Sequence, residues 1–187
     1  MKNEQRNRRD PLLHGAHVLD GFTKFAGLLS ASLFVVLILL VLYHIGLRLC
    51  GLSSIALFEL QWHVFAAGFL LAIPYALQYD KHVRLDVLCQ HYSPKQMYWL
   101  KIVSNLCFVM PFSLLILHYG SDFVMMSYQQ NEISDSGGLT HRYLIKAVPL
   151  LAFCLLFIQA YSEILKSIAF LKNDSKTHSD KQDKENQ

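Results

Sequence analysis

Hydrophobic residues in this chain gather into four long windows that are separated by polar segments. The windows cover residues 25–49, 60–79, 99–119 and 143–164. A helix needs about 20 mostly apolar residues to cross the roughly 30 Å hydrocarbon core of a bilayer. In the last window only sixteen uncharged residues separate Lys146 from Glu163, and snorkelling of these end residues completes the crossing. The pattern predicts an all-α integral membrane protein with four transmembrane helices.

The segments between the windows carry recognisable turn and cap signals. Residues 50–58 include Gly51 and two serines and predict a tight hairpin, so the first two helices should touch. Residues 80–92 mix apolar and charged positions over a length too short to span, which predicts a short interfacial segment between helices 2 and 3. Ser93-Pro94 then fits an N-cap with proline at the first helical position. Prolines 74, 111 and 149 inside the windows are interpreted as tolerated kinks.

The chain divides into three parts by composition. Residues 1–20 are polar and predict a cytoplasmic N-terminal segment, and because they have no apolar core we expect no separate cleavable signal. Residues 21–171 form the predicted four-helix membrane domain. Residues 172–187 are rich in Lys, Asp, Ser, Asn and Gln without aromatics, which predicts a disordered cytoplasmic tail.

Charge decides the orientation of the helices. The chain is 53% hydrophobic and only 17% charged, which leaves too little polar surface for a soluble globule of 187 residues. Five Lys or Arg residues precede or open the first window, four lie around the segment between the second and third, and five follow the fourth window, against three at the opposite ends. Positive residues stay on the cytoplasmic side. Both the N-terminus and the C-terminus are therefore predicted to be cytoplasmic, in a multi-pass protein of a bacterial cell inner membrane.

The polar residues inside the windows do not form a recognisable reaction site. A secondary transporter holds substrate or ion with polar groups near the bilayer midplane, whereas the polar side chains here lie mainly towards the helix ends. We therefore expect no transport by this chain alone. It also lacks a nucleophile-and-base arrangement, a phosphate loop and a CxxC pair, so no catalytic residue, no cofactor and no metal site is predicted. Its four cysteines, at 50, 89, 107 and 154, are interpreted as small packing residues.

Three histidines offer an alternative function. His44, His63 and His118 all lie towards the same ends of three different predicted helices, as a haem-binding membrane electron-transfer subunit would require. Ordinary pairing is the leading explanation, because His44 is four residues before Arg48 and His63 is four residues after Glu59. A stand-alone membrane protein of another role is the remaining alternative.

A series of short motifs is more specific than any single residue. Glu59 and Trp62 open the second helix, and the run His82-Val83-Arg84-Leu85-Asp86 follows its end. Further along the chain come Glu132-Ile133-Ser134, Gly138-Leu139, Lys146-x-x-Pro149 and Gln159. In order and spacing, residues 20–171 resemble the small, four-helix (DctQ-type) membrane subunit of TRAP transporters, the tripartite ATP-independent periplasmic carriers. Thr140-His141-Arg142 departs from the family pattern, since many relatives have Pro and Trp there.

The resemblance implies a non-enzymatic partner subunit and no cofactor. In this family the small subunit packs against a large membrane subunit that holds the sodium and substrate sites, and a periplasmic substrate-binding protein delivers the substrate. The transport is symport, and carboxylate uptake is typical. The residues then expected to form a partner interface or a structural motif are Glu59, Trp62, His82, Arg84, Asp86, Glu132, Lys146 and Pro149. Ordinary anchoring of helix ends at the membrane surface is the alternative for this set.

Overall fold

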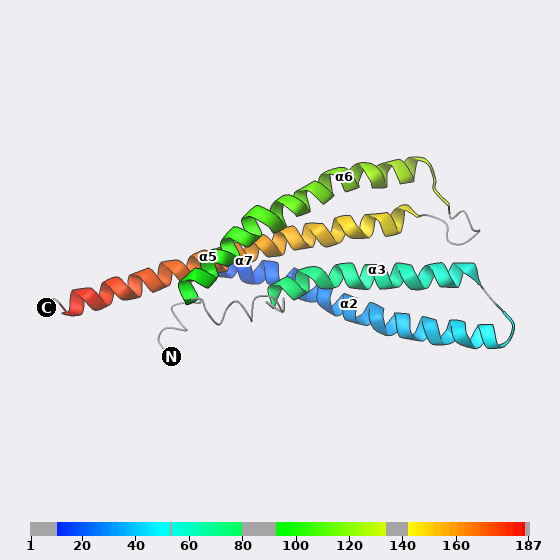
Figure 1. Ribbon diagram of the computed structural model, residues 1–187, viewed down its shortest axis with the longest axis horizontal. Coiled ribbons are helices and arrows are strands. Elements are labelled where there is room, and N and C mark those ends of the chain that lie inside the picture. The colour runs from blue at the N-terminus through cyan, green and yellow to red at the C-terminus, as the bar shows by residue number, and fades with distance from the viewer. Residues whose placement is uncertain (1–10, 53, 80–92, 134–141, 186–187) are drawn as a thin grey trace.

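The computed structural model describes residues 11–52, 54–79, 93–133 and 142–185. These residues form the helices α2 (Pro11–Leu49), α3 (Ile55–Gln78), α5 (Pro94–Ser104), α6 (Met110–Gln129) and α7 (Tyr143–Glu185), and a π-helical turn, η1 (Asn105–Val109), joins α5 to α6 (Figure 1). Four helical segments are long and apolar enough to cross a membrane, at residues 15–49, 55–78, 95–129 and 143–172. The predicted all-α membrane fold with four spans is confirmed.

Two helices are longer than their hydrophobic windows. At 1.5 Å per residue, the 39 residues of α2 reach about 58 Å, roughly twice the hydrocarbon thickness. It begins at Pro11 instead of residue 25, and proline suits a first turn because its missing N–H would have no partner there. Helix α7 continues to Glu185, where the sequence predicts a disordered tail. The chain has no Gly or Pro after Pro149 that would end the helix earlier.

A short hairpin joins α2 to α3, as predicted. The amide of Leu52 donates to the carbonyl of Leu47 at 3.0 Å and that of Gly51 to Arg48 at 3.1 Å, which is a Schellman ending. Gly51 has a φ of 77°, in the left-handed region that glycine enters without steric cost. The Ser54 side chain then accepts from the amide of Leu57 and caps α3. The two helices pack against each other, so the predicted contact between them is confirmed.

The α2–α3 interface is built on close approach at small residues. A Cβ added to Gly27 would lie within 3 Å of the Tyr75 ring. About one helical turn further along α2, the Ser30 hydroxyl donates to the carbonyl of Gly68 at 2.6 Å. Small residues let membrane helices approach closely enough for van der Waals packing and such hydrogen bonds. These small residues therefore help to fix the position of α3 on α2.

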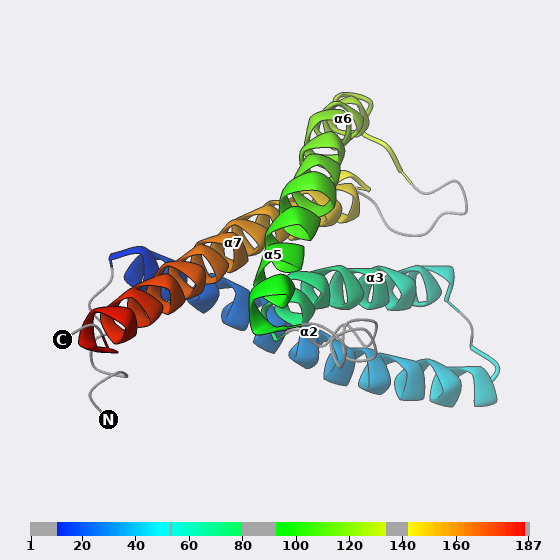
Figure 2. The same ribbon diagram turned by 60° about the vertical axis from the view of Figure 1, so that its left-hand side comes forward.

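Helix α7 is the central element, because it contacts α2, α3, α5 and α6 (Figures 1 and 2). Its buried positions carry mostly small side chains, while large apolar side chains of the other helices, such as Phe25, Leu42 and Phe108, are exposed. This reverses the order of a water-soluble bundle, as expected where lipid is the solvent. Cys50, Cys107 and Cys154 are also exposed and free. Their predicted packing role is wrong, since Ala and Ser occupy the helix contacts; Cys89 lies outside the described residues.

The rod of α5, η1 and α6 shows how one proline is accommodated. The amide of Met110 donates to the carbonyl of Asn105, five residues back, and Pro111 follows directly. Proline cannot donate a hydrogen bond and would clash with a carbonyl of the preceding turn, so the wider π turn gives its ring room. At the start of the rod, Ser93 and Gln96 form a capping box with Pro94 in the first turn, which confirms the predicted N-cap.

Candidate functional site

Polar side chains in the described part of the chain concentrate at the two ends of the bundle. At the end of the bundle where the chain passes from α6 to α7, four residues form a group that we call the Glu132 cluster. At the opposite end, where α2 crosses α7, a larger group forms what we call the Asp20 network. The members of the cluster are Ser127, Glu132, Arg142 and Lys146; those of the network are Asp20, Thr23, Gln159, Ser162, Glu163 and Lys166.

In the Glu132 cluster, one carboxylate ties the end of α6 to the start of α7. Its Oε2 accepts hydrogen bonds from the Ser127 hydroxyl, at 2.7 Å, and from the Lys146 ammonium. Its Oε1 lies 3.8 Å from the Arg142 guanidinium. The backbone carbonyl of Glu132 also accepts from the amide of Arg142 at 3.3 Å. The Lys146 hydrogen bond, followed by that from Ser127, lowers the pKa of the Glu132 carboxyl below its ordinary range.

A groove of about 600 Å³ opens beside this cluster, between α3, α6 and α7. Its rim carries Glu132, Arg142 and Lys146, and its walls and floor are apolar. The Lys146 ammonium lies 4.1 Å from the centre of the Phe123 ring, within cation–π distance. The apolar residues of the groove are Trp62, Ile116, Gly120, Phe123, Ile145, Pro149 and Leu150.

The structure brings together half of the residues singled out from the sequence. Trp62, Glu132, Lys146 and Pro149 are separated by up to 87 positions in the chain, yet all four line this one groove. Glu59 is a buried residue one turn earlier in α3 than His63 and is not among the lining residues. The remaining members of the predicted set, His82, Arg84 and Asp86, lie outside the described residues, as does the predicted interfacial segment at 80–92.

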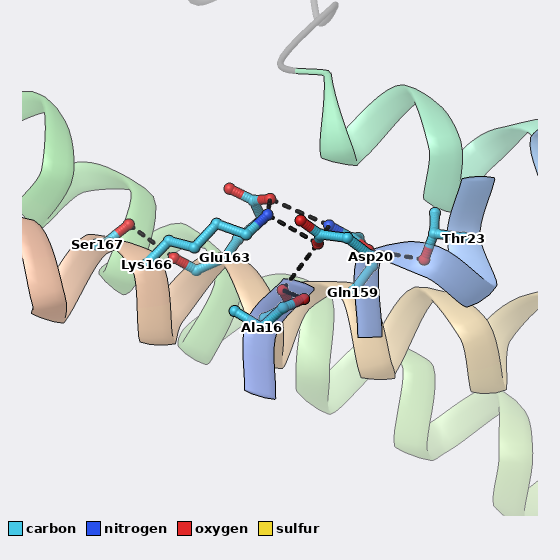
Figure 3. Close-up of polar contacts among 8 residues, drawn as sticks. Ala16, Asp20, Thr23, Gln159, Glu163, Lys166 and Ser167 are labelled. Carbon is cyan, nitrogen blue, oxygen red and sulfur yellow. Dashed lines mark hydrogen bonds and ion pairs between the residues drawn. The ribbon is translucent and has the colours of Figure 1, made fainter. Parts of the chain in front are cut away.

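The Asp20 network joins α2 to α7 through buried side chains (Figure 3). One oxygen of Asp20 accepts from Gln159 at 3.1 Å and from Ser162 at 2.9 Å, and it lies 2.8 Å from the Lys166 ammonium. Lys166 also donates to Glu163 at 2.6 Å.

Two further contacts extend the network along the helix crossing. The Thr23 hydroxyl donates to the amide oxygen of Gln159 at 2.7 Å, and the Ser162 hydroxyl approaches the carbonyl of Ala16 at 3.2 Å. Thr23, Gln159 and Ser162 are completely buried. Because every one of these polar groups has a partner, the network holds the crossing at low desolvation cost.

The sequence carries a signal for this network, although hydrophobic windows alone do not reveal it. On sequence grounds Asp20 only ends the polar N-terminal segment and Gln159 belongs to the family motif, with no structural role for either. Yet residues 159, 162, 163 and 166 recur at helical spacing and share one face, as do residues 16, 20 and 23. A polar stripe at the edge of a hydrophobic window is thus a signal for buried contact as well as for a helix end.

The contacts of the histidines do not favour the haem alternative. The Nδ1 of His44 lies 3.1 Å from the Gln61 amide nitrogen, and the Nδ1 of His63 lies 2.6 Å from the carbonyl of Glu59, within its own helix. His118 is exposed on α6, which packs mainly on α7 rather than on α2 or α3. Among the described residues, no group of three or more His, Cys, Asp or Glu could hold a metal ion. The geometry therefore favours ordinary pairing of these rings.

Comparison with known proteins gives one match. A family model described as "Tripartite ATP-independent periplasmic transporters, DctQ component" matches residues 37–170, which is more than half of the chain. No curated protein and no solved structure matches. The matched range begins within α2 and ends within α7, so it includes the Glu132 cluster and the α7 side of the Asp20 network.

Proposed function

Since the chain belongs to the family of DctQ components of tripartite ATP-independent periplasmic transporters, we propose that it is the small scaffold subunit of a sodium-driven symporter. In this proposal a large membrane subunit holds the sodium and substrate sites, and this chain is bound to it in a bacterial inner membrane. A periplasmic binding protein delivers the substrate, an organic anion with a carboxylate. The family is one of transporter components and not of enzymes, so the proposal assigns no catalytic residue.

The observation that carries the proposal is the distribution of polarity in the bundle. Charged side chains of the described residues lie towards the ends of the helical rods, and buried hydroxyls deeper in the bundle bond to backbone carbonyls, as Ser30 does to Gly68 and Ser113 to Val109. A coupling site needs polar groups near the midplane that can bind and release an ion or solute. This bundle supports a role as a stiff buttress against which a transport domain moves.

We propose that both termini face the cytoplasm. The start of α2 and the end of α7 lie at one end of the bundle, and the α2–α3 hairpin lies at the other (Figures 1 and 2). Fourteen of the 17 Lys and Arg residues belong to the first of these ends by sequence. This asymmetry supports the orientation, because positive residues are retained in the cytoplasm.

The motif residues are proposed to act in structure or assembly. Glu132 and Lys146 join α6 to α7 and so fix the periplasmic end of that helix pair. Glu59, Trp62 and Pro149 are proposed to shape the surface of α3 and α7 beside it. On sequence grounds His82, Arg84 and Asp86 are proposed to contact the large subunit from the cytoplasmic side.

Assembly with a large subunit is the direct test. The tagged chain is purified from native membranes in a mild detergent, and its partners are identified by mass spectrometry. We expect a multi-helix permease in equimolar amount, and sodium-driven uptake in vesicles when both subunits and the binding protein are present. Elution of the chain alone, or uptake by the chain alone, would contradict the proposal. A Soret band with stoichiometric haem would instead favour the electron-transfer alternative.

A further inference from the structure

The groove beside the Glu132 cluster combines a cationic rim with an apolar floor. Arg142 and Lys146 contribute two positive charges, and Glu132 contributes one negative charge. The Lys146 ammonium already donates a hydrogen bond to Glu132. By contrast, the described contact of the Arg142 side chain is an ion pair at 3.8 Å, longer than a hydrogen bond. A guanidinium carries five N–H donors in a planar fork that suits phosphate. The rim can therefore accept an additional anion.

The residues around the groove indicate how deep it lies in the membrane. Arg142 immediately precedes α7, and the first residue of α7 is Tyr143, a residue type that favours the boundary between headgroups and hydrocarbon. The floor residues Ile116 and Leu150 lie further inside their spans. A molecule filling this groove would thus meet cationic groups at headgroup level and apolar side chains below them.

We propose that the groove binds one phospholipid with an anionic headgroup. Its phosphate would be held by Arg142 with support from Lys146, and one acyl chain would lie over Ile116 and Leu150. The volume of about 600 Å³ lies within the range of ligand sites in proteins, roughly 300–1,000 Å³. The bound lipid would fill the angle between α3 and the α6–α7 pair, and in the proposed orientation it belongs to the periplasmic leaflet.

Charge complementarity favours a lipid over a polypeptide as the occupant. The net charge of the rim is positive, which matches a phosphate with no other charge in its headgroup. The bilayer presents such molecules at this depth continuously, and acyl chains suit an apolar floor better than the polar backbone of an inserted loop. Lipid binding involves only this chain and the bilayer, so it does not require the proposed transport role.

Native mass spectrometry of the purified full chain tests the headgroup contact. The delipidated protein is mixed with dioleoylphosphatidylglycerol or with dioleoylphosphatidylcholine. We expect one phosphatidylglycerol per chain and weaker binding of phosphatidylcholine. Arg142→Gln should weaken phosphatidylglycerol binding about tenfold, as expected for one charge-assisted hydrogen bond. The control is Arg48→Gln, because Arg48 is exposed at the same end of the bundle but does not line the groove.

A second pair of variants tests the acyl-chain contact without touching the rim. Ile116→Trp should fill the floor and abolish lipid retention, while Leu115→Trp, on the exposed neighbouring position, should leave it unchanged. Elution volume and melting temperature confirm that each variant is folded. The proposal is overturned if both lipids bind equally, if Arg142→Gln and Arg48→Gln behave alike, or if soluble glycerol phosphate displaces the lipid as an equal competitor. Displacement of the lipid by the large subunit would assign the groove to a polypeptide instead.

Discussion

The Asp20 network predicts an asymmetry between its two charged partners. Lys166 lies 2.8 Å from Asp20 and 2.6 Å from Glu163, so one cation faces two carboxylates. Removing the cation by Lys166→Met leaves two carboxylates close together in a site where the Asp20 side chain is 10% exposed. Removing the charge of Asp20 by Asp20→Asn leaves Lys166 paired with Glu163 and retains an oxygen that can accept from Gln159 and Ser162.

The magnitudes follow from this difference. Loss of one partner of a buried ion pair costs about 3–5 kcal/mol, and because Lys166 is 25% exposed the lower end of that range applies. Asp20→Asn replaces charge-assisted hydrogen bonds, worth about 1.5–3 kcal/mol, by neutral ones, worth about 0.5–1.5 kcal/mol, so the expected cost is about 1–1.5 kcal/mol. For a protein of this size about 1 kcal/mol shifts the melting temperature by roughly 2–4 °C. We therefore expect a fall of about 6–12 °C for Lys166→Met and of about 2–6 °C for Asp20→Asn.

The assay is thermal unfolding of the purified complex in detergent, followed by fluorescence-detected size exclusion. Lys24→Met is the matched control, since Lys24 is an exposed lysine on α2 beside Thr23, and it should shift the melting temperature by less than about 2 °C. In the double variant Lys166→Met/Glu163→Gln, one of the two carboxylates is neutralised, and part of the stability should return. Equal losses for Lys166→Met and Asp20→Asn, or no recovery in the double variant, would refute the reasoning.

Three further predictions concern topology, acid stability and assembly. A reporter fused after Lys172 should be active only in its cytoplasmic form and one at Ser136 only in its periplasmic form; the reverse pattern would contradict the orientation. The folded state lowers the pKa of the Glu132 carboxyl, so the stability that Glu132 contributes is present at neutral pH and is lost as the pH falls through that lowered pKa. Glu132→Gln should therefore flatten the acid side of a plot of stability against pH. An unchanged plot would exclude Glu132 as the source of the acid sensitivity. Arg84→Ala and Asp86→Ala should each lower the yield of the complex on co-purification while membrane insertion is retained. Wild-type yields would show that these two residues do not contribute to assembly and only anchor the helix end at the membrane surface.

Features set by neighbouring residues were predictable from the sequence. The four spans follow from hydrophobic length, the α2–α3 hairpin from Gly51 and its serines, and the start of α5 from Ser93-Pro94. These signals act within one or two helical turns, so they do not depend on which helix packs against which. The Glu132 and Lys146 motif was also found, although their ion pair needed the structure.

Features that depend on pairing between distant helices were not predictable in this way. Asp20 and Lys166 each lie at the edge of a hydrophobic window, where a charged residue normally marks a helix leaving the membrane. Only the crossing of α2 with α7 shows that they meet, because 146 positions separate them in the chain. The same crossing explains why α2 begins before its window and why α7 continues through Lys166 and Ser167: these parts of the two helices carry polar side chains that are largely buried, which a measure of hydrophobicity alone does not detect.

The two polar clusters together explain how a bundle with small buried side chains can be stiff. Interfaces of Ala, Ser and Gly permit close approach, but without large interlocking side chains they resist sliding weakly. The Asp20 network fixes α7 to α2 at one end, and the Glu132 cluster fixes α7 to α6 at the other. Because α7 is held at both ends and contacts the remaining helices between them, a rotation of α2 or α7, or a displacement of the end of α6, would break charge-assisted bonds. A subunit that serves as a fixed support requires this property, and the positions of the two clusters supply it.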